Sequence, residues 1–169
     1  MPEKEVVERA RRDEAQGKSA TTQAGEFVRE EMHHVREGKH GARSPQQAIA
    51  IGLSKARRAG VKLSPPRKGK TSSRIRSQAR RDLRKGRRSN RSKPSKTRSR
   101  AVLGALKREG HSAASHASLS HQAHRAAQRR SARSRHQAAM RAVHTKGPRG
   151  LHRAAQTAAR TRAKHRASS

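Results

Sequence analysis

Hydrophobic side chains recur at helical spacing in the first third of the chain. Val28, Met32 and Val35 stand at i, i+4 and i+7, so one side of residues 24–37 is apolar and the pattern predicts a helix. Residues 2–16 carry a shorter apolar stripe and predict a short, weak helix. A glycine directly follows each of the two patterns and marks its end.

Start and stop signals agree on a further helix over residues 45–59. Ser44 can cap its first turn, Pro45 fits the first helical position, and Gln47 completes a capping box. Gly60 supplies the left-handed residue that commonly ends a helix. This helix and the one before it should form an antiparallel hairpin. Because so small a unit is marginal alone, we expect it to need the first helix, a second copy or a ligand.

Beyond residue 63 the apolar stripes become short. Residues 64–100 are rich in Ser, Arg, Lys and Pro and predict a basic linker, in which residues 73–85 could form a nascent helix. Another short helix is predicted over 99–109. Residues 112–145 contain neither Pro nor Gly and are rich in the helix formers Ala and Arg, which predicts a long helix. A Gly-Pro pair should break it before a last helix over 149–166.

Charge is distributed very unevenly. The chain of 169 residues has 44 Lys and Arg against 11 Asp and Glu, a formal net charge of +33. Residues 1–37 hold nine of the acids and seven basic residues, a net of −2, whereas residues 38–169 have a net of +35. Asp82 and Glu109 are the two acids of that basic part. The two parts are therefore expected to have different roles, with the basic part acting electrostatically.

The composition also limits how much of the chain can fold. There is one Phe and no Tyr, Trp or Cys, and low hydrophobicity with high charge is typical of disorder. The predicted fold class is mostly α, a small helical hairpin with a long basic, largely disordered or conditionally helical C-terminal region. We divide the chain into an acidic-mixed segment at 1–23, the hairpin module at 24–63, the basic linker at 64–100 and an Ala/Arg/His-rich helical tail at 101–169.

So large a positive charge predicts binding to a polyanion. Lys and Arg attract nucleic-acid phosphates and release condensed counterions, and the planar guanidinium of Arg, which outnumbers Lys 31 to 13, fits a phosphate well. The expected contacts are the clustered basic side chains Arg57, Arg58, Arg74, Arg76, Arg80, Arg81, Arg84, Lys85, Arg87, Arg88, Arg125, Arg129, Arg130, Arg133, Arg135, Arg149, Arg153, Arg160 and Arg162.

Other chemistries fit the residues less well. His33, His34 and His40 lie close in sequence, but there is no cysteine, almost no carboxylate outside residues 1–37, and a net charge that opposes cations, so we expect no metal and no other cofactor. No catalytic residues are expected, because Ser and His neighbours lack an orienting acid on a rigid scaffold. The scarcity of aromatics disfavours proteins that stack on single-stranded bases. No secretory signal or membrane segment is expected, and no membrane partner.

Duplex DNA is the expected partner, bound without sequence preference in a histone-like, nucleoid-associated role in the cytoplasm. RNA binding or ribosome association is the alternative, since the same electrostatics apply to RNA. Residues 1–63 are the expected site of any protein partner or self-association. Histidines add charge as the pH falls, so affinity for DNA should rise between about pH 7.5 and 5.5.

The segment from Met32 to Leu63 resembles a family of small basic bacterial and viral proteins of uncharacterised function. The matching residues are Met32, Lys39, Gly41, Gln47-Ala48-Ile49-Ala50-Ile51, Leu53-Ser54, Ala56-Arg57 and Ala59-Gly60, with Gly52 where Ala is usual. The resemblance implies a compact helical unit and no particular chemistry. The tail, in which the pentapeptide His124–Gln128 recurs at His152–Gln156, is similar in composition to histone-H1-like tails, although GC-rich coding drift could also produce it.

Overall fold

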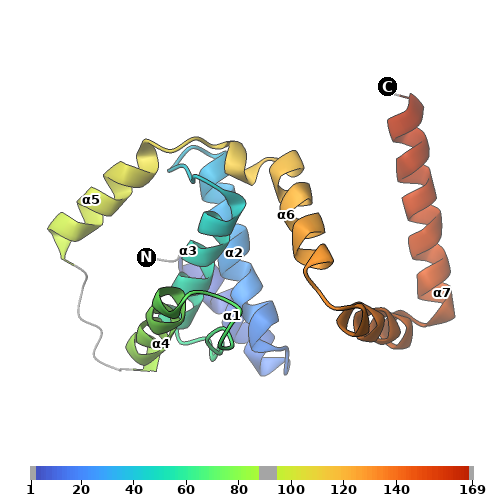
Figure 1. Cartoon of the computed structure of the whole chain (residues 1–169), viewed down its shortest axis with the longest axis horizontal. Helices are drawn as coiled ribbons and strands as arrows, with labels where there is room; N and C mark the ends of the chain where they lie inside the picture. The colour runs from blue at the N-terminus through green and yellow to red at the C-terminus, as the bar shows by residue number, and fades with distance from the viewer. Residues whose placement is uncertain (1–2, 88–94, 168–169) are drawn as a thin grey trace. The chain divides into compact units, whose positions relative to one another are not determined.

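The structure of the protein is a computed structural model that describes residues 3–87 and 95–167. The described residues form seven α-helices and one short 3-10 turn, with no strand among them. The helices are α1 (Lys4–Ala15), α2 (Ala20–Arg36), α3 (Pro45–Ala59), α4 (Ser73–Arg87), α5 (Lys96–Lys107), α6 (His116–Gln128) and α7 (Ala132–Ala167), and the turn is η1 (Ser112–Ala114) (Figure 1). None of the described helices is both long and apolar enough to cross a bilayer. The chain divides into two compact units, Met1–Gln122 and Ala123–Ser169, called the first and second unit below.

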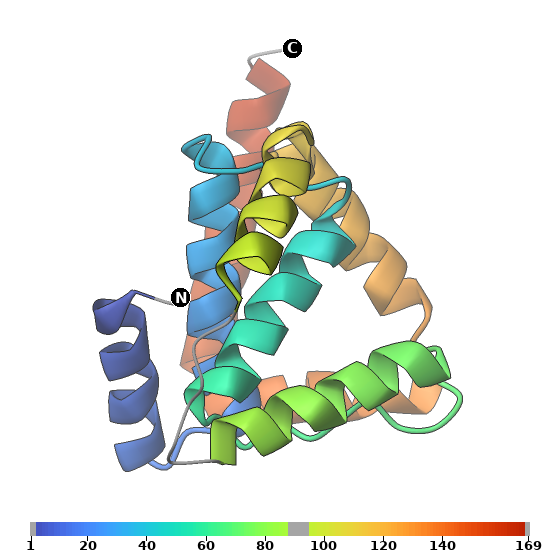
Figure 2. The same ribbon diagram turned by 90° about the vertical axis from the view of Figure 1, so that its left-hand side faces the viewer.

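The predicted hairpin is confirmed as the centre of the first unit. Helices α2 and α3 lie side by side and run in opposite directions (Figure 2). They approach closely at Gly52, where an added Cβ would stand 2.7 Å from the Cα of Val28. Since real side chains do not reach that separation, the glycine at position 52 is what allows this crossing. Helix α2 begins before residue 24 because Ser19 caps it, its side chain accepting from Thr22 N at 3.3 Å.

The caps of α3 are also confirmed. The Ser44 side chain accepts from Gln47 N at 3.3 Å, and the Gln47 side chain in turn accepts from the backbone of Arg43 at 2.8 Å. At the other end Gly60 has φ 111°, and Val61 N donates to the carbonyl of Ala56 at 3.1 Å. This is the left-handed helix end that the glycine predicted.

Two small apolar clusters hold the hairpin to its neighbours. At one end Val6 and Ala10 of α1 pack with Phe27 of α2, and α1 flanks α2 in Figure 2. The buried members of this cluster are Val6, Ala10, Ala24, Phe27, Ala56 and Val61. At the other end Met32 and Val35 pack against Ala114 of the 3-10 turn. The first helix therefore does cover the hairpin, as expected, but a later segment of the chain covers it as well.

That later segment departs from the sequence interpretation, which assigned residues 101–169 to a separate tail. Gly41 N donates to Leu106 O at 2.9 Å and Ala42 N to Gly110 O at 3.0 Å, so the last turn of α5 and the residues after it are bound to the hairpin loop. The approach is close, since a Cβ at Gly41 would overlap the carbonyl of Glu109. Residues up to 122 thus belong to the first unit.

Helix α4 changes the interpretation of residues 64–100 as a linker. The nascent helix at 73–85 is a full helix that packs on α3, with Ala79 and Asp82 buried. Gly86 lies inside this helix rather than after it. Its backbone contacts the end of α3 so closely that an added Cβ would stand 2.0 Å from Arg57 O.

The described part of the second unit is helical with two breaks, one at residues 129–131 and one at Gly147. The long helix predicted over 112–145 is interrupted at residues 129–131, where Ser131 caps a new helix by accepting from Ser134 N at 3.2 Å. The break predicted at the Gly-Pro pair is confirmed, because Gly147 has φ 62° and ψ 175°, values outside any helix. The part of the chain expected to be disordered or conditionally helical is thus helical in the structure.

Candidate nucleic-acid interface

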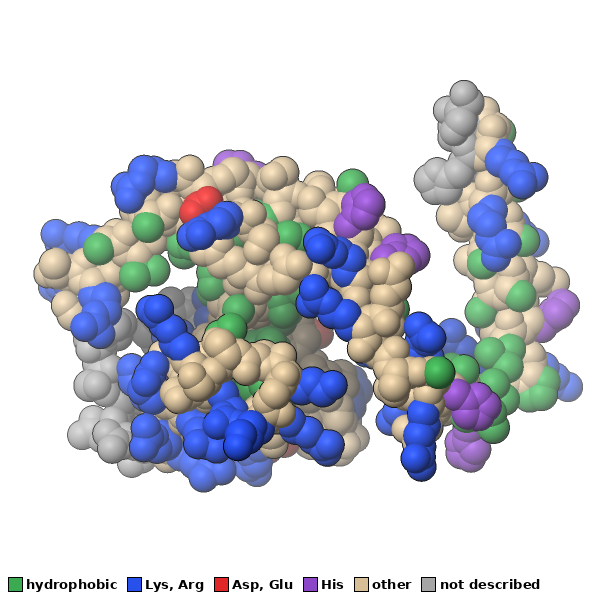
Figure 3. Space-filling model, in the orientation of Figure 1, with side chains coloured by type: hydrophobic (Ala, Val, Ile, Leu, Met, Phe, Trp, Pro, Cys, Tyr) green, Lys and Arg blue, Asp and Glu red, His purple; other side chains and the backbone are tan. Residues whose placement is uncertain are grey.

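The most organised group of basic side chains lies on α4. Its buried residues face α3, and its outer side carries seven Lys and Arg in two rows: Arg74, Arg81 and Lys85 in one, and Arg76, Arg80, Arg84 and Arg87 in the other. All seven are exposed except Arg76, which is partly buried. Lys and Arg side chains crowd over α4 in Figure 3, on a face where few acidic side chains are visible. We call these seven residues the α4 basic face.

A buried carboxylate holds this helix in place. Asp82 is 1% exposed, and its Oδ1 lies 3.2 Å from Arg58 Nε on α3 and accepts from Gln78 Nε2 at 3.1 Å. The single acid of α4 therefore faces inward, where it pairs with a basic residue of the neighbouring helix. As a result the outer side of α4 carries no acid to offset its arginines.

The structure corrects the expectation for Arg57. This residue is 7% exposed, and its guanidinium donates to Leu63 O at 3.2 Å and Ser64 O at 3.4 Å. Burial lowers the pKa of Arg57, while the negative charge of Asp82 opposes that shift. Arg57 thus fixes the chain where it leaves α3 and does not present its charge to a ligand. Arg58 keeps half of its side chain exposed beside Asp82.

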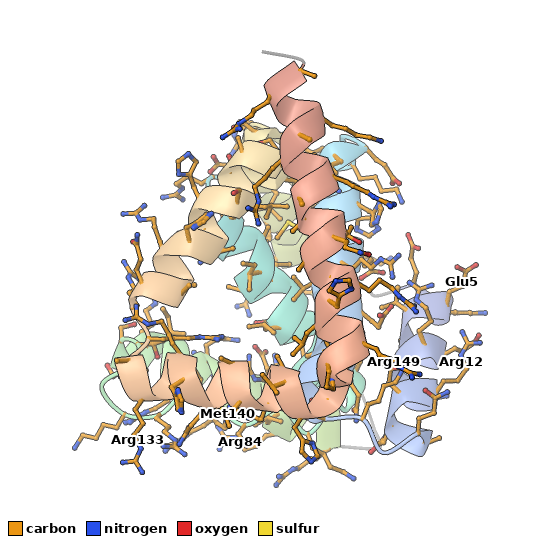
Figure 4. All side chains as sticks on the ribbon, turned by 90° about the vertical axis from the view of Figure 1, so that its right-hand side faces the viewer. Glu5, Arg12, Arg84, Arg133, Met140 and Arg149 are labelled. Atoms are coloured by element: carbon orange, nitrogen blue, oxygen red, sulfur yellow. The ribbon has the colours of Figure 1, made fainter. Side chains whose placement is uncertain are left out.

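The remaining expected contacts lie on α6 and α7 and in the short segment between them. Every one is exposed: Arg125, Arg129, Arg130, Arg133, Arg135, Arg149, Arg153, Arg160 and Arg162. Arg133 projects from the first part of α7 and Arg149 from the start of its second part (Figure 4). None of the described residues of α6 is buried. These arginines therefore form no single defined surface. Arg88 lies outside the described residues.

Sequence reasoning passed over α5, whose basic residues are also exposed. Lys96, Arg98 and Arg100 follow one another at alternate positions of its first turns, and Lys107 lies at its end. The signal was available, because the basic composition of the linker continues into this helix. Val102 and Leu103 of the same helix are 54% and 44% exposed.

A second group of ionisable side chains lies inside the first unit, and spacing alone did not reveal it. Glu31 on α2 is 1% exposed, with Oε1 2.8 Å from His40 Nε2 and Oε2 2.7 Å from Lys55 Nζ. Glu30 is also buried, and its Oε2 lies 3.5 Å from the same lysine. Two of the nine acids of residues 1–37 are therefore used within the fold.

At the edge of this group Glu3 joins the chain start to α2 and its loop. The Glu3 carboxylate lies 3.0 Å from His34 Nε2 and 3.3 Å from Lys39 Nζ. The contacts with His34 and then Lys39 lower the pKa of Glu3. Contacts with Glu37 and Glu3 correspondingly raise the pKa of Lys39. The acidic residues of this edge thus pair with cations of the first unit.

Comparison with known proteins places part of this chain in context. Residues 16–69 match a sequence family described only as a family of unknown function, DUF6496. The match spans α2, α3 and the loop between them, which agrees with a small domain of uncharacterised function. No curated protein and no solved structure matches the chain.

Proposed function

We propose that this protein binds nucleic acid through phosphate contacts without reading base sequence, and that duplex DNA is its partner in a histone-like, nucleoid-associated role. The observation that carries the proposal is the α4 basic face: seven basic side chains on one helix whose single acid is buried against α3. A helix so charged repels itself, and phosphates remove that repulsion.

The spacing of the α4 basic face suits a duplex. Arg76 and Arg87 are eleven residues apart, which is about 16 Å along a helix. A duplex carries roughly ten phosphate charges over that length, twice the density of a single strand. Four arginines in that row can therefore each find a phosphate without any requirement on the bases. Because phosphate contacts carry no sequence information, little sequence preference should result.

The second unit would add contacts by folding on its partner. None of the described side chains of residues 123–167 is buried, and Ala/Arg-rich helices without tertiary contacts are marginal in water. Phosphates would offset the repulsion between positively charged turns and so favour the helical form. In this proposal the first unit provides a preformed contact on α4, and residues 123–169 are conditionally helical.

A salt titration of duplex binding tests the proposal. If ten arginines contact phosphate, the logarithm of the binding constant should fall with the logarithm of salt at a slope of about −9. A slope shallower than about −3 would contradict the mechanism. Circular dichroism of the full chain should also show helix content rising when DNA is added.

Structured RNA is the alternative partner, because it offers the same phosphates. Competition between duplex DNA and a folded RNA at one salt concentration separates the two. If RNA displaces DNA preferentially, the protein is an RNA-binding protein by the same phosphate contacts. If the two compete equally, the protein binds both. Failure to bind either at physiological ionic strength would remove the proposal.

A further inference from the structure

The interior group around His40 contains the donor atoms of a metal site. Glu31, His34 and His40 each offer one ligand atom, and these three atoms lie within 4.8 Å of one another. His34 and Glu31 come from α2 and His40 from the loop that leads to α3. Glu31 and His40 are buried, and the His34 side chain is 12% exposed. The three residues come together only because the loop folds back over the end of α2.

The hydrogen bonds of His40 show that something positive belongs between it and Glu31. His40 Nδ1 lies 3.0 Å from Gly41 O, which can only accept, so Nδ1 carries a proton. In a neutral imidazole the other nitrogen, Nε2, is then an acceptor, yet it lies 2.8 Å from Glu31 Oε1. Two acceptors do not face each other at that distance. A proton or a cation must therefore lie between the two atoms.

The charges nearby point the same way. Glu30 and Glu31 are both buried, and Lys55 is the one lysine paired with them among the described residues. Glu30 Oε1 accepts from the backbone N of Glu3 at 2.7 Å, and Glu30 Oε2 shares Lys55 with Glu31. With a neutral His40 the interior therefore keeps one uncompensated negative charge, which is costly away from water. A bound divalent cation would compensate that negative charge.

The surrounding contacts match those that orient metal ligands. A metal-binding histidine usually donates its other ring N–H to a carbonyl or carboxylate, and a ligating carboxylate is itself paired. For His40 the carbonyl is Gly41 O, which lies beside the ring Nδ1, and for Glu31 the partner is the Lys55 side chain, which pairs with its Oε2. His34 Nε2 contacts Glu3 Oε1 at 3.0 Å, which leaves Nδ1 as its available nitrogen. Glu31 and His40 thus each have one atom held by a neighbour outside the group and another that faces the other ligand.

We propose that Glu31, His34 and His40 form a binding site for a transition-metal divalent cation of the zinc class. Two imidazoles and one carboxylate suit Zn²⁺, whereas Ca²⁺ and Mg²⁺ prefer oxygen ligands alone. Tetrahedral bonds of about 2.0–2.1 Å place ligand atoms roughly 3.3 Å apart, so small side-chain rotations suffice. A fourth position would be taken by water. The ion would enter from the hollow between α1 and α2, which His34 lines beside Glu3 and Glu30.

Such an ion would tie α2 to the loop that starts α3 and so stabilise the hairpin. The positive field of the chain opposes cations in general, but residues 1–37, which supply two of the ligands, have a net charge of −2. The proposal concerns the fold of the first unit and does not rest on nucleic-acid binding.

The test measures Zn²⁺ binding to the full chain by calorimetry and by competition with a coloured chelator. The wild type should bind one Zn²⁺ tightly, and His34→Ala or His40→Ala should each weaken that binding at least 100-fold. His33→Ala is the matched control, because His33 neighbours His34 but is exposed, and it should leave the affinity within about twofold. A double variant, His121→Ala with His124→Ala, checks for binding by the exposed histidines of α6.

Two further measurements keep the test decisive if a variant unfolds. Co²⁺ added to the wild-type chain should give the intense visible bands of a four-coordinate site, and His34→Gln, a small change at a partly exposed position, should remove them. Circular dichroism of each variant without metal reports its folding. If wild type and His34→Gln bind Zn²⁺ equally, or Co²⁺ gives only six-coordinate spectra, the proposal is overturned and the contact between His40 and Glu31 is only structural.

Discussion

Removing one row of the α4 basic face should separate local phosphate contacts from the effect of net charge. The perturbation replaces Arg76, Arg80, Arg84 and Arg87 with glutamine. Glutamine has nearly the same helix propensity as arginine, so α4 should persist. None of the four side chains has an ion pair among the described residues, and the buried Asp82–Arg58 pair is left intact. The variant therefore changes the outer charge of α4 and little else.

The expected magnitude follows from counterion release. Each phosphate contact contributes about 0.9 to the slope of log affinity against log salt, so losing four should make the slope shallower by about 3.6. Between 50 and 200 mM salt, a fourfold change, the wild type should lose on the order of 100-fold more affinity than the variant. The difference between the two proteins should thus be largest at low salt and narrow steeply as salt rises.

The assay is fluorescence anisotropy with a short duplex over that range of salt. The matched control replaces Lys4, Arg11, Arg12 and Arg29, four exposed basic residues of α1 and α2, with glutamine. Arg12 projects from α1 in Figure 4. Both variants fall from +33 to +29, so their long-range fields are equal. Equal slopes for the two variants would refute the reasoning, because net charge and not the α4 basic face would then govern binding.

Four further predictions concern the fold. Gly86→Ala should destabilise the first unit by about 1–3 kcal/mol in urea unfolding, since its Cβ would stand 2.0 Å from Arg57 O and must push α4 from α3. Phe27→Ala, at a fully buried site, should cost about 3–5 kcal/mol, and an unchanged urea midpoint would contradict the packing described above. Ser44→Ala should cost about 1 kcal/mol by loss of the α3 cap, measured in the same way. Contacts with His34 and Lys39 lower the pKa of Glu3, so its carboxylate stabilises the fold above about pH 4.3, and this stabilisation is lost as the pH falls through the lowered pKa. In a plot of melting temperature against pH, Glu3→Gln should therefore show a smaller decrease at acid pH than the wild type.

The hairpin could be predicted because its signals are local. The stripe on α2, the Ser44 cap and Gly60 each act within a few residues, and together they leave little freedom in where the helices begin and end. What these residues determine is one supersecondary unit, and that unit agrees with the structure.

What packs on the hairpin could not be predicted in the same way. The contacts at Gly41 and Gly86 join backbone segments that are far apart in sequence. From sequence alone, a glycine that begins a linker cannot be distinguished from one that allows a carbonyl of another segment to approach closely. The apolar stripe of α4 is also thin, because Ala79 is its main buried apolar residue and Asp82 is buried beside it. Such a helix is held by a charge pair and a close backbone contact, neither of which hydrophobic spacing reveals.

The candidate site was predictable in composition but not in arrangement. Counting arginines identified the basic region, yet it could not distinguish Arg57, which is buried against two carbonyls, from its exposed neighbour Arg58. Nor could it show that Glu31 and His40 meet, because the loop between them turns back on α2. Charge is a property of each residue, whereas the partner of a charge depends on the tertiary fold.

The two acids of residues 38–169, Asp82 and Glu109, both lie at contacts between segments of the first unit. Asp82 pairs with Arg58 to hold α4 on α3, and Glu109 lies 3.6 Å from Arg43 where the chain after α5 meets the hairpin loop. Both acids of residues 38–169 thus lie where a basic segment of the first unit is bound to the α2–α3 hairpin. Anywhere on the outer surface they would have cancelled part of the field that attracts a polyanion. At these two contacts they hold basic segments on the α2–α3 hairpin and leave the α4 basic face without an acid beside its arginines.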